Sequence, residues 1–353
     1  MNLDEPAALE RADPHGACRV LAEFPEQCRR ARTLRPVPPP GPGRPRLVLL
    51  AGMGGSAAGA DLVAACAAAS LEVPLVVHRG YGLPAAGGHE ALVLASSYSG
   101  NTVEVLSAVE TALGRGLPVI VLTAGGRLGR LATDHGLPRV TLPGGLMPRM
   151  ALGYLVLGTL AALRACGVDA AAEDDVSEAL DVLTAQAGDL GVASPVDENE
   201  AKRVAQALHG RLPVIYGGPL TGAAAYRWKT DLEENGKVLA VSGAVPEMNH
   251  NEIEAWWGPA ARDRHVVLLR EEGEGAEIGR RMAILRHMVE AADGSVSEVC
   301  ARGRGRLARL LSLVYLGQWA SVYLAALAGV DPWTVPRLEE MKRRMAAGGD
   351  AAP

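Results

Sequence analysis

Glycine and hydroxyl residues follow two apolar segments of the chain, in a pattern that suits phosphate binding. The first segment ends in GMGGS at residues 52–56, and the second ends in SSYSGNT at residues 96–102. A helical stretch follows each of them, and the free backbone N–H groups of a helix N-terminus attract anions. Serine and threonine hydroxyls donate to phosphate oxygens without bringing charge. The two segments therefore predict an anion site where two neighbouring strands end.

A dinucleotide is the competing ligand for this site. Gly52, Gly54 and Ala57 half-fit the glycine fingerprint of dinucleotide-binding folds. The acidic residue expected about twenty positions later is missing, and the second strand ends in His78 and Arg79, which leaves NADP as the nucleotide to consider. A dinucleotide does not need the second, hydroxyl-rich edge, whereas a terminal phosphomonoester does. A tight turn without a ligand is the remaining alternative.

The motifs GMGGS and SYSGNTVE resemble the phosphosugar-binding signature of the sugar isomerase (SIS) domain family. The resemblance implies a set of phosphate-binding residues: Gly54, Gly55, Ser56, Ser97, Ser99 and Thr102. It does not by itself imply catalysis, because SIS domains also occur in regulators that only sense sugar phosphates.

Groups for an aldose–ketose isomerization are present outside these motifs. Such a reaction needs a carboxylate base, a group that opens the sugar ring and a cation near the enediolate. Glu234 lies at a predicted helix C-terminus before an Asn-Gly turn, which favours a position facing a cleft; a solvated helix end is the alternative, and it suits Glu233. His250 lies in a polar loop and can pass a proton near neutral pH, although most loop histidines have no such role. Arg149 is the candidate cation.

The order of motifs resembles the bifunctional phosphoglucose/phosphomannose isomerases over roughly residues 45–345. The matching motifs are GMGGS, SYSGNTVE, MPR at 147–149, ENEAK at 198–202, RWKTDLEENGK at 227–237, PEMNHNE at 246–252, and DP at 331–332 leading to Lys342. The resemblance implies that Glu234 shuttles the proton between C1 and C2, and that Arg149 stabilises enediolate charge. It implies that His250 opens the ring from the neighbouring subunit, with Lys342 assisting at the ring oxygen. The implied protein is a homodimer that binds hexose 6-phosphates at shared sites, without metal or other cofactor.

Two positions depart from the family pattern. Val335-Pro336 replaces a Thr-Pro pair whose hydroxyl helps to accommodate the mannose epimer, so Val335 puts activity on mannose 6-phosphate in question; Thr334 lies beside it on a different face. Gly236 replaces the usual alanine after Glu-Asn, and we expect it to loosen the turn that carries the base.

Two other functions stay open at this point. One is a non-catalytic SIS-domain sensor of sugar phosphates, which would have to explain the presence of Arg149, Glu234, His250 and Lys342. The other is a different SIS isomerase, acting on an amino-sugar or heptose phosphate. Heptose isomerases of this type use zinc, and the sequence lacks paired histidine and acidic ligands at helical spacing.

Short apolar strands alternate with helices twice, which predicts an α/β fold with two SIS-type doubly wound parallel sheets flanked by helices. The predicted organisation is a helical arm and proline-rich connector (1–45), a first SIS domain (46–168), a linker helix (169–195), a second SIS domain (196–304) and C-terminal helices that complete the active site (305–353). Within it we expect one or two helices in residues 1–35, one long helix over 147–166 and a strand over 238–242.

Composition excludes some other classes. The chain has 353 residues and a net charge of −5, which gives no reason to expect nucleic-acid binding. The first residues have no signal-peptide pattern, and the apolar stretches 150–163 and 310–328 are predicted to be core helices and not membrane spans. We therefore expect a cytoplasmic protein that uses neither nucleic acid nor membrane as partner. Five scattered cysteines are expected to be buried free thiols: Cys18, Cys28, Cys66, Cys166 and Cys300.

Overall fold

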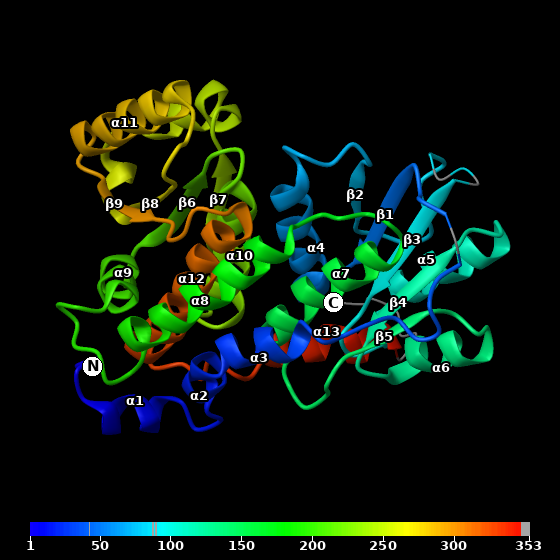
Figure 1. Ribbon diagram of the computed structural model, residues 1–353. Helices are drawn as coiled ribbons and strands as arrows, with labels where there is room; N and C mark the ends of the chain where they lie inside the picture. The colour runs from blue at the N-terminus through cyan, green and yellow to red at the C-terminus, as the bar shows by residue number, and fades with distance from the viewer. Residues whose placement is uncertain (42, 87, 89, 347–353) are drawn as a thin grey trace.

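The computed structural model describes residues 1–346 except 42, 87 and 89. The last seven residues of the predicted C-terminal segment, 347–353, lie outside the described residues. Figure 1 shows two α/β units side by side, each with its own sheet, and a layer of long helices between the two sheets. Three short helices form an N-terminal arm at the lower left and centre of Figure 1: α1 (Pro6–Ala12), α2 (Ala17–Ala22) and α3 (Phe24–Ala31).

The first unit is a five-stranded parallel sheet of order β2-β1-β3-β4-β5. Its elements are β1 (Leu47–Gly52), α4 (Gly54–Ala67), β2 (Leu75–His78), β3 (Ala91–Ser96), α5 (Val103–Gly114), β4 (Val119–Thr123), α6 (Gly126–Asp134), β5 (Arg139–Thr141), η1 (Pro148–Ala151) and α7 (Leu152–Ala165). Successive residues of β1 point into different cores: Val48 packs in the large central cluster, whereas Leu49 packs under α5 and α6. Helices cover both faces, so the strands are apolar throughout.

The second unit is a four-stranded parallel sheet of order β7-β6-β8-β9. Its elements are α9 (Glu200–Leu208), β6 (Leu212–Gly217), α10 (Gly222–Glu234), β7 (Val241–Ala244), the short 3-10 helices η2 (Glu247–His250), η3 (Glu252–Ala255) and η4 (Pro259–Asp263), β8 (Arg264–Arg270), α11 (Ala276–Ala291) and β9 (Ser295–Cys300). Helix α8 (Glu173–Leu190) connects the two units, and α12 (Arg306–Ala328) and α13 (Pro336–Ala346) follow β9. The predicted α/β fold with two parallel sheets is confirmed.

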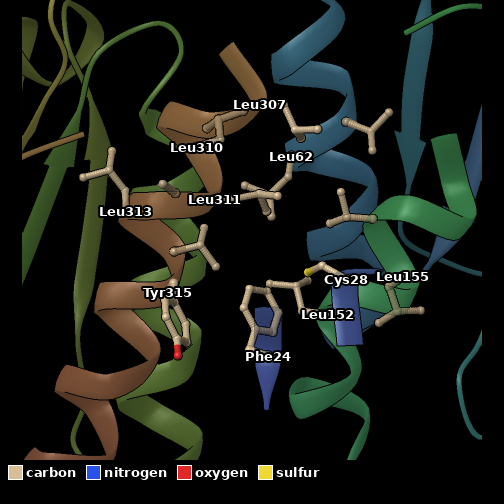
Figure 2. Packing of buried hydrophobic residues seen from close by; sticks show 14 of the residues in the cluster. Phe24, Cys28, Leu62, Leu152, Leu155, Leu307, Leu310, Leu311, Leu313 and Tyr315 are labelled. Atoms are coloured by element: carbon tan, nitrogen blue, oxygen red, sulfur yellow. The ribbon is translucent and has the colours of Figure 1, made fainter. Parts of the chain in front are cut away.

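Helix α12 joins the two units through one continuous core. Leucines and Tyr315 of α12 meet Leu62 of α4, Leu152 of α7 and Phe24 of α3 (Figure 2). The rings of Phe24 and Tyr315 stack with centroids 5.2 Å apart. Among the described helices α12 is the one long and apolar enough to cross a membrane, and 94% of its most apolar window is buried inside the structure. That burial agrees with the prediction of a core helix.

Several local predictions were wrong. The arm holds three helices because Gly16, in a left-handed conformation, and Pro25 each start a new one. The helix predicted over 147–166 is divided: it begins with the 3-10 turn η1, which Pro148 opens, and the α-helical part starts only at Leu152. The strand predicted over 238–242 starts only at Val241, where pairing with β6 begins. Cys300 is exposed and not buried, because it ends a strand at the sheet edge.

Gly317 offers a test of how tightly α12 packs against α10. A Cβ at this position would collide with the indole ring of Trp228, whose Nε1 donates to the carbonyl of Leu313. We expect Gly317→Ala to lower the free energy of unfolding by about 1–3 kcal/mol despite its better helix propensity. Gly188→Ala in α8 is the control, because nothing lies within 4 Å of its added Cβ and it should gain up to ~1 kcal/mol. Denaturant unfolding measures both; equal stability of the two variants would contradict the packing described.

Candidate active site

The hydroxyl groups predicted to bind phosphate gather where β1 and β3 end. The strands are adjacent and parallel, with Gly52 opposite Ser96, so the loops that follow them lie at one sheet edge. The hydroxyl oxygens of Ser97 and Thr102 are 2.8 Å apart, and the backbone N–H of Tyr98 donates to Ser56 Oγ at 3.3 Å. Helices α4 and α5 start here, so their free N–H groups add positive potential to the hydroxyls.

The other predicted phosphate ligands differ in exposure. Ser99 is exposed, and its hydroxyl accepts the N–H of Asn101 at 3.3 Å. Gly54 has a φ of +51° and an open environment, so its backbone is accessible in a conformation that favours glycine. At Gly55 a Cβ would lie 2.9 Å from the carbonyl oxygen of Pro148 and 3.2 Å from Arg149 Cα. The start of α4 is therefore packed directly against η1.

Arg149 is buried, with 2% of its surface exposed, and its guanidinium connects three distant segments. Its Nε donates to Asn235 Oδ1 at 2.7 Å, and its Nη2 donates to the carbonyl oxygens of Pro332 and Trp333 at 2.7 and 2.6 Å. Its Nη1 faces Glu234 Oε2 at 3.6 Å. Burial lowers the pKa of Arg149, and the carboxylate of Glu234 opposes that shift. The predicted cation and the predicted base thus form an ion pair.

Glu234 is the last residue of α10, and its side chain is about one-third exposed, at 30%. The neighbouring carboxylate of Glu233 points elsewhere, because Lys229 holds it at 2.7 Å. The ammonium of Lys237 donates to the backbone carbonyl of Glu234. Glu234 is therefore the carboxylate of this helix end that combines access to solvent with contact to Arg149.

Three polar residues on one face of α10 were not among the predicted site residues. Asn235 both accepts from Arg149 and donates to the Ser321 hydroxyl at 2.8 Å. Arg227 donates to the backbone carbonyl of Arg149 at 2.8 Å and pairs with the buried Asp231 at 2.6 Å. Burial raises the pKa of Asp231, whereas the adjacent Arg227 opposes the rise. In the sequence, Arg227, Asp231 and Asn235 follow one another at intervals of four residues, and this spacing could have indicated that they share one face of the helix.

The turn after α10 is closely packed. A Cβ on Gly236 would lie 2.8 Å from the carbonyl oxygen of Leu232 and 3.3 Å from Leu324. Glycine at position 236 thus lets the end of α10 approach α12 closely. We expected this glycine to loosen the turn, but the close contacts favour a tightly packed turn.

His250, Lys342 and Val335 are not brought into this cluster. His250 is exposed at the end of η2, and Lys342 is exposed on α13. Within the part of the chain that the structure describes, neither side chain has a hydrogen-bond or ion-pair partner. Val335 is half-buried just before α13. The described residues also contain no group of three His, Cys, Asp or Glu arranged to hold a metal ion.

Comparisons with known proteins agree with this fold. Residues 197–345 match the family model of the bacterial phospho-glucose isomerase C-terminal SIS domain. A bifunctional phosphoglucose/phosphomannose isomerase of Caldicellulosiruptor bescii is 35% identical over 306 residues, which are 85% of this chain and 89% of the relative. Its counterpart in Aquifex aeolicus is 34% identical, over 84% and 90% of the two chains. A crystal structure of a glucose-6-phosphate isomerase-like protein from Thermus thermophilus matches with a TM-score of 0.64 and 23% identity, over 95% and 98% of the chains.

Two parallel sheets, a hydroxyl cradle at helix N-termini and the SIS-domain match define an SIS-type phosphosugar protein. The two bifunctional isomerases that are 35% and 34% identical over most of both chains place the protein more specifically within this class. The chain belongs to the bifunctional phosphoglucose/phosphomannose isomerase family.

Ser97 gives a test of the cradle that does not depend on catalysis. Its hydroxyl contacts that of Thr102 and also accepts the Gly100 N–H. We expect Ser97→Ala to weaken binding of fructose 6-phosphate about tenfold, the loss of roughly one hydrogen bond to a charged group. Titration calorimetry measures this, with Ser70→Ala, at the other end of α4, as the control. Unchanged affinity in Ser97→Ala would remove this serine from the phosphate site.

Proposed function

We propose that the chain is an aldose–ketose isomerase that interconverts glucose 6-phosphate and fructose 6-phosphate. The observation that carries the proposal is the ion pair of Arg149 and Glu234, 3.6 Å apart and close to the phosphate cradle through the contact of Gly55 with η1. The relatives' names point to the same reaction. They also include phosphomannose isomerase, so we extend the proposal to mannose 6-phosphate, with Val335 as the residue that sets its rate.

In this proposal the chemistry is divided between the two units. The cradle of Ser56, Ser97 and Thr102 holds the phosphate and so fixes where C1 and C2 lie. Glu234 removes the proton from one of these carbons and returns it to the other. The negative charge that develops on the enediolate oxygen is stabilised by Arg149, whose guanidinium is already oriented by its hydrogen bonds and needs no reorganisation.

Ring opening needs an acid that protonates the ring oxygen and a base that takes the proton of the anomeric hydroxyl, and the roles proposed for Arg149 and Glu234 do not include these two steps. His250 and Lys342 are the candidates, and both are exposed on the single chain. We propose that the protein is a homodimer in which each subunit contributes His250 to the site of its partner. The exposed Trp257, with 86% of its surface accessible, lies seven residues from His250 and supports an interface at this loop.

A sugar-phosphate sensor is the second candidate, because the cradle alone would serve it. It gives no physical reason for keeping Glu234 beside a buried arginine at a helix C-terminus, where an acid opposes the helix dipole. A coupled assay separates the two: the isomerase forms glucose 6-phosphate from fructose 6-phosphate without added metal, and EDTA leaves the rate unchanged. Binding of fructose 6-phosphate without turnover of any hexose phosphate would favour the sensor.

The two neighbouring glutamates form a matched pair for testing the base. We expect Glu234→Gln to lower kcat about a thousandfold, because the amide cannot accept the proton, while fructose 6-phosphate still binds. Glu233→Gln is the control, since that carboxylate pairs with Lys229 and should leave kcat within about twofold of the wild type. The coupled assay measures both variants. Equal effects of the two changes would show that Glu234 is not the base.

Mixed dimers test whether His250 acts across an interface. Glu234→Gln and His250→Ala subunits, co-expressed in equal amounts, form mixed dimers in half of the cases, and each mixed dimer has one site with both groups intact. The mixture should recover about a quarter of wild-type activity, although each variant alone is nearly inactive. If His250 acts within its own chain, mixing restores nothing, and the shared-site proposal fails.

A further inference from the structure

The N-terminal arm reaches the segment that orients Arg149. His15 Nδ1 lies 3.0 Å from Asp331 Oδ2, and its ring stacks on that of Trp333, with centroids 6.4 Å apart and planes 18° apart. His15 belongs to the turn between α1 and α2, more than three hundred residues away in the chain. Nothing in the residues around His15 predicted a partner for it, so its contact is a finding of the structure.

The segment 331–333 is a tight turn with a defined orientation. Asp331 Oδ1 accepts the backbone N–H of Trp333 at 2.8 Å, which leaves its Oδ2 for His15. The carbonyl oxygens of Pro332 and Trp333 both accept from Arg149 Nη2. The two carboxylate oxygens of Asp331 thus join the arm to the same turn that supplies two of the three hydrogen-bond acceptors of Arg149.

The orientation of this turn matters for Arg149 because few other groups can replace the two carbonyl acceptors that the turn supplies. Arg149 is almost fully buried, so an acceptor that moves away leaves a guanidinium N–H without a partner. The guanidinium would then turn to find a new partner for Nη2, and Nη1 would leave its position opposite the carboxylate of Glu234. Helix α13 begins three residues after the turn, so the direction of α13 depends on the same contact.

We propose that His15 is a positioning residue for the isomerase, which holds the 331–333 turn so that Arg149 faces Glu234. The proposal rests on the proposed function of this site. His15 and Asp331 are partly exposed, at 48% and 24%, and such pairs add little to global stability. The contact therefore acts on the geometry of the site and not on whether the chain folds.

Steady-state kinetics test the proposal. We expect His15→Ala to lower kcat about tenfold, with KM for fructose 6-phosphate within about twofold and an unchanged melting temperature, since the phosphate cradle is untouched. His15→Asn should recover most of kcat, because its side-chain amide N–H replaces the Nδ1 donor at the same distance from Cβ. A change in KM without a loss of kcat, or no rescue by asparagine, would contradict the proposal.

A control variant removes a charge contact at the other end of the same arm. Asp4 Oδ1 accepts the N–H of Val196 at 2.8 Å and lies 3.6 Å from Lys202 Nζ, far from the 331–333 turn in the chain. We expect Asp4→Asn to leave kcat within about twofold of the wild type, because these contacts do not reach the turn. An equal loss in Asp4→Asn and His15→Ala would mean that attachment of the arm in general is required, and would overturn the specific role of His15.

Amide hydrogen exchange separates this proposal from the proposed function. His15→Ala should speed exchange at least several-fold in peptides covering 330–336, where the Trp333 N–H is bonded to Asp331. Asp4→Asn should leave those peptides unchanged. If the wild-type protein turned over no hexose phosphate, the proposed function would fail, and faster exchange would still support the hold of His15 on the turn. Unchanged exchange and kcat in His15→Ala would overturn the positioning role while the isomerase activity stands.

Discussion

The structure of the site depends on one constraint, the burial of the Arg149 guanidinium. Each guanidinium N–H that is buried without an acceptor costs about 1–3 kcal/mol or more, so the chain must supply acceptors from several directions. It does so with Asn235 at the end of α10 and with the carbonyls of Pro332 and Trp333 before α13. Residues far apart in the chain therefore converge on η1, and Nη1 is left facing Glu234.

The same constraint explains a helix end that is poorly placed for stability. Two glutamates close α10, where carboxylates oppose the helix dipole at a cost of about 0.3–1 kcal/mol each. At Glu233 this unfavourable interaction with the helix dipole is offset by an ion pair with Lys229, one helical turn earlier, as is common on protein surfaces. Glu234 pairs with Arg149 instead. Hydrogen bonds to other groups hold Arg149 in place, so its guanidinium cannot move with the glutamate side chain. A residue that is unfavourable for its local secondary structure but is paired with a rigidly held side chain is typical of a functional position.

The sequence predicted the features that depend on local patterns of residues, and it did not predict those that depend on contacts between distant residues. The parallel sheets agree with it, because the apolar strand periods lie within short windows. The nearness of Arg149 to Glu234 was implied by the family resemblance and not by a local pattern, since the two residues lie far apart in the chain. Asn235 was missed as a site residue, because its value comes from one hydrogen bond to a residue 86 positions away. The late start of β7 and the exposure of Cys300 depend on which strand lies at a sheet edge, and edge position follows from the order of strands in space.

In the proposed function, the segment that binds phosphate packs directly against the segment that carries Arg149, and this contact gives the phosphate more than a holding role. The start of α4 packs so closely on η1 that Gly55 has no room for a Cβ beside Pro148 and Arg149. An anion bound at the N-terminus of α4 thus lies on the same rigid joint as the guanidinium that faces Glu234. In that proposal, the binding energy gained at the phosphate holds the reacting carbons in a fixed relation to Glu234 and Arg149. A cradle on a flexible loop would lose part of that energy to ordering the loop, and it would not fix the carbons relative to Glu234 and Arg149.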